Sequence, residues 1–95
     1  MEYGILVHEK QDDVGVAVLD IGAGTEIGAA TLEGEPVGLV KVIQDIPLGH
    51  KVALHDLSPD QNVIEYGHPV GHATQKISLG EHVHVHNLRT NRWRK

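Results

Sequence analysis

Three histidines alternate near the end of the chain, in the segment His82-Val83-His84-Val85-His86-Asn87. If this segment is a β-strand, successive side chains point to opposite faces, so the three imidazoles share one face. Imidazole nitrogens two residues apart on a strand can bind one metal ion, and imidazole also transfers protons near neutral pH. The spacing therefore predicts metal binding or acid–base chemistry, and the alternative is a solvated strand face with the valines packed inward.

Two further segments place polar side chains beside turns. In Ile46-Pro47-Leu48-Gly49-His50-Lys51 the turn is followed by an imidazole and a cation. Together they can bind a carboxylate or phosphate, although a plain turn is the commoner role of such a tripeptide. In Glu65-Tyr66-Gly67-His68, Tyr66 can donate a hydrogen bond to a substrate oxygen, although packing is the commoner role of such a ring. No nucleophile elbow, phosphate-binding glycine loop or pair of catalytic carboxylates accompanies them. These residues predict part of an active site rather than a complete one.

An internal repeat indicates the elements that position these residues. Three segments share the order Ala, Asp or Lys, Ile or Leu, Gly or Asp, then Ile or Val; they span residues 17–27, 53–63 and 73–83. Each is typical of a short strand, a turn and the start of another strand. Gly24, Asp60 and Gly80 stand where the turn needs a positive φ. Asp20 and Asp56 occupy equivalent repeat positions, which favours turn capping over catalysis.

Runs typical of β-strands surround these turns. They lie at residues 14–19, 37–43, 63–67 and 82–88. Eleven Gly and four Pro interrupt every long window, and no stretch has the periodicity of a helix. Residues 22–34 are the most loop-like and are predicted to form a hairpin tip. We therefore predict a single all-β domain over residues 1–95, made of many short strands with tight turns around an aliphatic core.

Composition excludes several function classes. The net charge of −5 argues against nucleic acid as the main partner, because phosphate binding needs a basic face. The chain has no Cys, no signal-like leader and no apolar run of membrane-spanning length, so a cytoplasmic protein is expected. Exposed β edges leave a homo-oligomer open. A basic tail at residues 89–95 is either a docking segment or a solvated terminus.

Four blocks, in this order and spacing, resemble the SAF domain at the N-terminus of the altronate dehydratase family. They are Ile46-Pro47-Leu48-Gly49-His50-Lys51-Val52-Ala53-Leu54, Val63-Ile64-Glu65-Tyr66-Gly67, Gly71-His72-Ala73-Thr74 and Gly80-Glu81-His82-Val83-His84-Val85-His86-Asn87. The ending Asn87-Leu88-Arg89-Thr90-Asn91-Arg92-Trp93 resembles that of the free-standing small subunits of the family. The resemblance covers nearly the whole chain and implies the β-clip (SAF-like) fold. His55 departs from the family pattern, in which Arg is more usual.

The resemblance implies a lyase that acts on hydroxy acids. Altronate and galactarate dehydratases remove water to give a 2-keto-3-deoxy acid, typically with iron(II) or manganese(II). The related sulfolactate sulfo-lyase eliminates sulfite and has separate small and large subunits. Most of the catalytic machinery in these enzymes lies in the large portion. We therefore expect a small subunit of an altronate-type hydro-lyase, or of a sulfolactate sulfo-lyase, that is inactive without a large catalytic subunit.

The resemblance also implies roles for particular residues. Those expected to act in catalysis are His50, Lys51, His84 and His86. Those expected to contact the substrate are Tyr66, Glu81 and Asn87. His84 and His86 are the expected metal ligands, and His82 follows the family motif less strictly. Two other functions stay open: a non-enzymatic module that binds a carbohydrate or an acidic ligand, and a metal-binding or scaffolding protein that uses the histidine strand.

Overall fold

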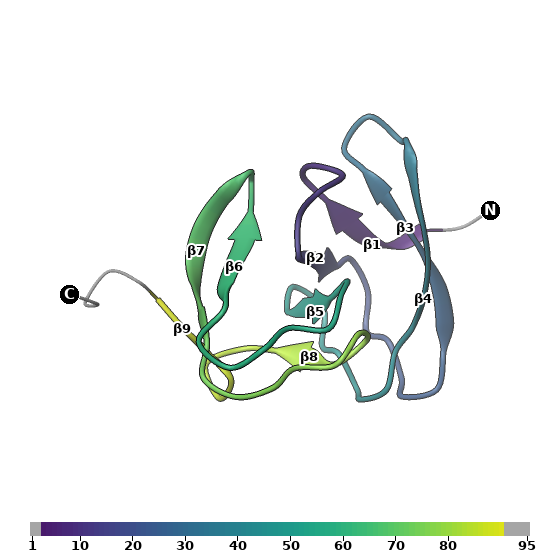
Figure 1. The fold of residues 1–95 in the computed structure, drawn as a ribbon. Coiled ribbons are helices and arrows are strands. Elements are labelled where there is room, and N and C mark those ends of the chain that lie inside the picture. Colours follow the sequence, from purple (N-terminus) through teal and green to yellow (C-terminus); the bar gives the residue numbers. More distant parts are fainter. Residues whose placement is uncertain (1–2, 91–95) are drawn as a thin grey trace.

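The computed structural model describes residues 3–90, which form nine strands and no helix. The strands are β1 Tyr3–Val7, β2 Val14–Ala17, β3 Glu26–Thr31, β4 Pro36–Lys41, β5 Lys51–Ala53, β6 Asn62–Glu65, β7 His68–Ala73, β8 His82–Val83 and β9 Leu88–Arg89 (Figure 1). The all-β prediction is confirmed. Within the described range, no helix could serve as a membrane span.

The strands form two sheets. The larger has the order β4-β3-β1-β2-β5-β8 and the smaller the order β6-β7-β9. Neighbouring strands are antiparallel except for β1 and β3, which are parallel. The β3–β4 hairpin and the β6–β7 hairpin stand on opposite sides of β2 and β5 (Figure 1). The short central strands therefore join two lobes.

Each lobe has its own aliphatic core. The first contains Ile5, Val7, Ala17, Ile21, Ala29, Val40, Val42, Ile46, Val52 and Leu54. The second contains Val14, Ala53, Leu57, Val63, Ala73, Ile77 and Val83. Because side chains alternate along a strand, β5 contributes Val52 to the first core and Ala53 to the second. Lys51 is two residues from Ala53, so it emerges on the side of the second lobe.

The turns of the repeat pack against each other in pairs. Backbone bridges join Ile21 to Ile46 and Leu57 to Ile77. The structure thus adds a fourth copy, residues 42–52, which the sequence pattern concealed because Val42 stands where the other copies have Ala. The residue that ends each turn has a positive φ, as predicted for three of them. They are Gly24 (91°), Gly49 (85°), Asp60 (66°) and Gly80 (86°).

Aspartates link the paired turns. Asp20 Oδ1 accepts a hydrogen bond from Leu48 N at 2.8 Å, and Asp45 Oδ1 accepts one from Ala23 N at 2.9 Å. In the second pair, Asp56 Oδ1 accepts from Leu79 N at 2.8 Å. The reciprocal bond would need an N–H at Pro59, which has none, and Lys76 stands where the other copies have Asp. The predicted capping role of Asp20 and Asp56 is confirmed.

Two predictions about the strands were wrong. Residues 22–34 are not a hairpin tip, because β3 occupies Glu26–Thr31 and only the next few residues turn. The small residues Gly28, Ala29 and Ala30 concealed this strand, yet they are buried beside β1. The strand predicted over residues 82–88 ends at Val83. Of the basic tail, Arg89 lies in β9 and residues 91–95 lie outside the described range.

Candidate functional site

A turn follows β8, and a buried asparagine holds it. Asn87 is fully buried, and its Oδ1 accepts a hydrogen bond from His84 N at 2.9 Å. Its Nδ2 donates to His82 O at 2.8 Å and to Glu81 Oε2 at 3.3 Å. Leu88 N donates to His84 O at 2.8 Å, which closes the turn. The three histidines therefore do not share a strand face, because local bonds of Asn87 end the strand after Val83.

The strand pairing of β5 with β8 brings His50 to the histidine segment. Lys51 lies opposite Val83 and Val52 opposite His82. His50 Nδ1 is 2.9 Å from His82 Nε2, and the rings of His50 and His84 stack with centroids 4.2 Å apart. One ring nitrogen from each of these three residues lies within 4.8 Å of the other two. We call His50, His82 and His84 the imidazole cluster.

The cluster differs from the predicted metal pair. His84 was predicted as a ligand and belongs to the cluster, whereas the predicted ligand His86 is outside the group found among the described residues. Its ring is near His82, with centroids 5.2 Å apart. Burial lowers the pKa of His82, and the neighbouring His50, His86 and His84 lower it further. A neutral imidazole keeps the lone pair that a metal ion needs.

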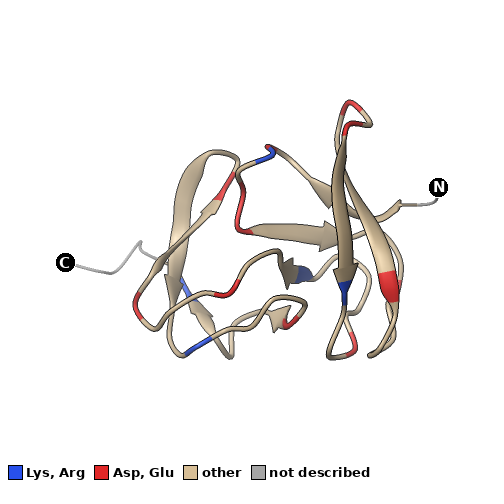
Figure 2. Ribbon diagram, turned by 45° about the vertical axis from the view of Figure 1, so that its right-hand side comes forward, with Lys and Arg blue, Asp and Glu red and all other residues tan. Residues whose placement is uncertain are grey.

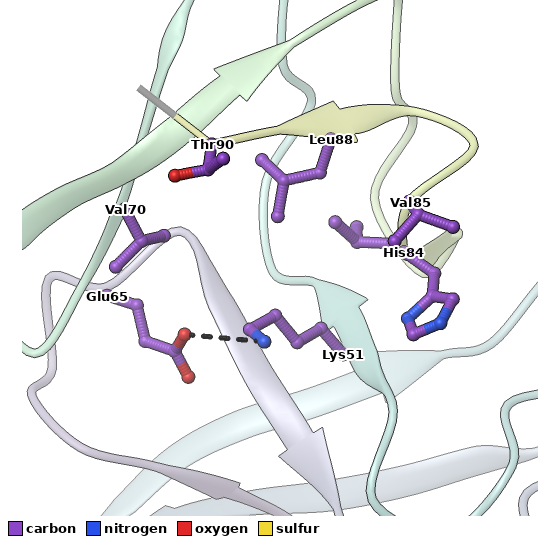
Figure 3. Close-up of a pocket in the computed structure, with 8 residues that line it drawn as sticks. Lys51, Glu65, Val70, His84, Val85, Leu88 and Thr90 are labelled. Atoms are coloured by element: carbon purple, nitrogen blue, oxygen red, sulfur yellow. Dashed lines mark ion pairs between the residues drawn. The ribbon is translucent and has the colours of Figure 1, made fainter. Parts of the chain in front are cut away.

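Lys51 lines a pocket of about 400 Å³ next to the cluster, between strands β5 and β8 and the smaller sheet. The pocket is lined by Lys51, Glu65, Val70, Val83, His84, Val85, Leu88 and Thr90 (Figure 3). Lys51 Nζ lies 3.8 Å from Glu65 Oε1, and Figure 3 shows the two side chains pointing toward each other, with His84 on the other side of Lys51. His84 therefore belongs both to the cluster and to the pocket.

Glu65 is a functional candidate that the sequence reasoning missed. Its side chain is only 4% exposed. Burial raises its pKa; Lys51 and His8 act in the opposite direction, and Asp12 adds to the increase. The alternation of side chains along β6 could have identified Glu65. It is two residues from the buried Val63, so its side chain also points inward. A carboxylate at such a position, with a lysine as its ion-pair partner, indicates a site.

Asp12 fixes the turn that follows Glu65. It is fully buried, and its carboxylate accepts hydrogen bonds from Glu9 N, Tyr66 N and Gly67 N. These bonds give Asp12 a structural role, because they hold the backbone of the turn. Tyr66, a predicted substrate contact, has a φ of 60° and stacks on His8 with ring centroids 3.7 Å apart. Tyr66 is not among the residues that line the pocket.

The other two predicted substrate contacts support the turn. Glu81 is half-buried, with Oε1 accepting from Ser78 N at 3.0 Å and Oε2 from Asn87 Nδ2. Asn87 is buried and uses both amide atoms within the protein. Asn87 therefore positions the turn in this structure, and its contact with a substrate stays a prediction. Of the residues predicted for catalysis, the structure brings His50, Lys51 and His84 together, and it places His86 beside them.

The fold and the site together define an all-β domain of the SAF type, with imidazoles and a lysine where β5 pairs with β8. Residues 3–91 match the altronate/galactarate dehydratase SAF domain, and the chain belongs to this family. This confirms the family resemblance read from the sequence.

Two kinds of relative match nearly all of the chain. It is 39% identical over 94 residues to subunit alpha of the (2R)-sulfolactate sulfo-lyase of Chromohalobacter salexigens, covering 98% of this chain and 100% of that subunit. It is 42% identical over 91 residues to the altronate dehydratase of Bacillus subtilis, and 45% identical over 91 residues to that of Escherichia coli. In both dehydratases the match covers 96% of this chain but 17% of the enzyme.

Proposed function

We propose that the chain is the small subunit of a two-component lyase that acts on a hydroxy acid. Its imidazole cluster and Lys51 would complete an active site on a separate large subunit. The observation that carries the proposal is the convergence of His50, His84 and Lys51 where β5 pairs with β8. The relatives support it, because in the altronate dehydratases this domain makes up only 17% of the enzyme.

The chemistry requires a cation, a base and an acid. Elimination removes a proton from the carbon beside the carboxylate, forms a carbon–carbon double bond, and expels the leaving group with its electron pair from the next carbon. The enol product then converts to a keto acid. Lys51, whose side chain is 34% exposed in the pocket, would bind the substrate carboxylate. His84 is exposed beside it as part of the cluster, so the base that takes the proton would come from the large subunit.

The expected divalent metal fits the residues present. The cluster offers three imidazole nitrogens within 4.8 Å of one another, a donor set suited to iron(II) and, less strongly, to manganese(II). His50, His82 and His84 would hold the ion, in place of the predicted pair His84 and His86. When bound, such an ion supplies positive charge for the oxygen on which negative charge develops.

Two leaving groups are candidates. The first is water, lost from a sugar acid such as altronate or galactarate, as in the dehydratases that share this domain. The second is sulfite, lost from sulfolactate, and a specific observation favours it: the similarity to the sulfo-lyase alpha subunit covers that subunit from end to end. Both eliminations need the same carboxylate-binding cation and proton transfer.

Reconstitution tests the proposal. The proposal predicts that a neighbouring gene encodes a large subunit. That subunit would be purified alone and together with this chain, and each sample given altronate, galactarate or sulfolactate with iron(II) or manganese(II). We expect elimination from one of these acids only when both chains are present. Full activity of the large subunit alone would reject a contribution from this chain. Tight binding of sugar acids by this chain, indifferent to the large subunit, would favour a non-enzymatic binding module.

A further inference from the structure

We propose that the imidazole cluster is a transition-metal site that is complete within this chain, so the chain binds its metal without a partner. His50, His82 and His84 would supply all of the protein ligands. The binding itself is independent of the proposed function. Only the catalytic role of the bound ion rests on the proposed function.

Two of the three nitrogens already have the spacing that one ion needs, and the third is nearby. Imidazole nitrogens lie ~2.0–2.1 Å from zinc-sized ions, so two ligands of one ion are about 3 Å apart at right-angle or tetrahedral geometry. His50 Nδ1 and His82 Nε2 are 2.9 Å apart, and the chosen nitrogen of His84 lies within 4.8 Å of both. In the metal-free protein, one of these two nitrogens must carry a proton and donate it in a hydrogen bond to the other. An ion between them would replace that proton.

The backbone at each of the three residues is fixed. His50 N donates to Pro47 O at 2.9 Å, and His50 O accepts from Ala17 N at 2.9 Å. His82 N donates to Gln44 Oε1 at 3.0 Å, and His84 N to Asn87 Oδ1 at 2.9 Å. A preorganised set of ligands loses little conformational freedom when the ion binds. The site therefore needs only small side-chain movements to close.

The donor set selects the kind of ion. Neutral imidazoles bind zinc, cobalt, nickel, copper and iron(II) well, whereas magnesium and calcium prefer oxygen ligands. Three protein ligands leave at least one coordination position for water or substrate, as in catalytic sites. Because His84 also lines the pocket with Lys51, that position lies near the place where a carboxylate would bind. A 2-hydroxy acid could then contact the ion and Lys51 together.

Cobalt(II) titration of the full chain, without an affinity tag and after chelator treatment, tests the site. Visible absorption reports the ligands around cobalt, and calorimetry with zinc(II) gives the stoichiometry and affinity. We expect one ion per chain and no response to magnesium. His84→Ala should weaken binding at least about tenfold, and because its side chain is exposed the variant should fold like the wild type. His50→Ala and His82→Ala should weaken binding similarly.

His86→Ala is the matched control, because His86 is on the same turn but outside the cluster. It should bind cobalt like the wild type, and thermal unfolding should show every variant folded. Equal binding by wild type and His84→Ala, or loss of binding with His86→Ala but not with His50→Ala, would overturn the inference. Lyase activity in a chain that binds no metal alone would reject this site but keep the proposed function. Metal binding by a chain that makes no contribution to elimination would keep this metal site and reject the proposed function.

Discussion

Lys51 and Glu65 form a weak ion pair whose cation remains available. Their 3.8 Å separation is near the limit for an ion pair, and Lys51 is partly exposed while Glu65 is buried. Burial raises the pKa of Glu65, so the carboxyl group is easier to neutralise than an exposed one. A substrate carboxylate can therefore compete for Lys51. Glu65 would hold the ammonium group in the pocket without cancelling its charge.

The first prediction concerns Lys51. In the reconstituted lyase, Lys51→Ala should lower kcat/KM by about 10²–10³-fold, since it removes the cation that stabilises negative charge. Steady-state kinetics with the responsive acid would measure this. Lys41→Ala is the control, because Lys41 is exposed on β4 and does not line the pocket. A Lys51→Ala enzyme within twofold of the control would contradict the assignment.

The second prediction concerns the pH dependence contributed by Glu65. The pKa of Glu65 is raised in the folded state. Its contribution to the stability of the protein is therefore fully present below its unfolded-state pKa, near 4.5, and is lost as pH rises through its folded-state pKa. Glu65→Gln should remove this loss. Urea unfolding of both proteins from pH 4 to 8 would show the variant gaining stability relative to the wild type as pH rises. A constant difference across that range would show that Glu65 is not desolvated.

At the scale of elements, the paired turns set the positions of the strands that carry the site. His50 follows one turn and His82 another, so their contact depends on how the turns pack. The Asp20 and Asp45 bonds tie one pair together from both sides, and the second pair has the Asp56 bond. The second pair lacks the reciprocal bond, because Lys76 and Pro59 stand at the two positions that would form it. The Lys76 position therefore serves as a control for the aspartate bonds.

The third prediction compares these positions. Asp20→Ala should lower the free energy of unfolding by about 1 kcal/mol, the usual value of one hydrogen bond. Lys76→Ala, at the equivalent position that faces Pro59, should change it by less than about 0.5 kcal/mol. Denaturant unfolding of the two variants would measure both. Equal losses would mean that the aspartate bond does not stabilise the turn pair.

The fourth prediction concerns the turn that carries His84. Asn87→Asp keeps an acceptor for His84 N but removes the donor to His82 O and places a carboxylate beside Glu81. It should destabilise the protein by about 1–3 kcal/mol and weaken cobalt binding. Adding Glu81→Gln should recover part of the stability, because the repulsion between carboxylates is removed. No recovery in this double-mutant cycle would reject the proposed contact between the two side chains.

Much of the element structure could be predicted, because strands rich in β-branched residues and turns with Gly or Asp have local signals. The alternation of Val and His through His86 resembled a strand, but it could not reveal that Asn87 bonds back to His82 and His84. The sequence indicated His50 and His84 separately. Their contact needs the register of β5 on β8, which joins segments far apart in the chain and has no local signal.

At the scale of the molecule, charged residues are scattered over loops and strands of both lobes (Figure 2). The site instead depends on the join between the lobes, where β5 contributes to both cores and carries Lys51. Val85, at the edge of the pocket, is 83% exposed. A large subunit that closed over this edge would cover Val85 and exclude water from Lys51 and His84, which strengthens their electrostatic effect.

The most direct test of the central claim separates assembly from chemistry. The large subunit would be combined with the wild-type chain or with the His84→Ala/Lys51→Ala double variant, and each mixture examined by size-exclusion chromatography and by elimination assay. We predict that the variant co-elutes with the large subunit as the wild type does, while kcat/KM falls at least about 10³-fold. A double-variant complex as active as the wild type would contradict the claim that this chain supplies active-site residues.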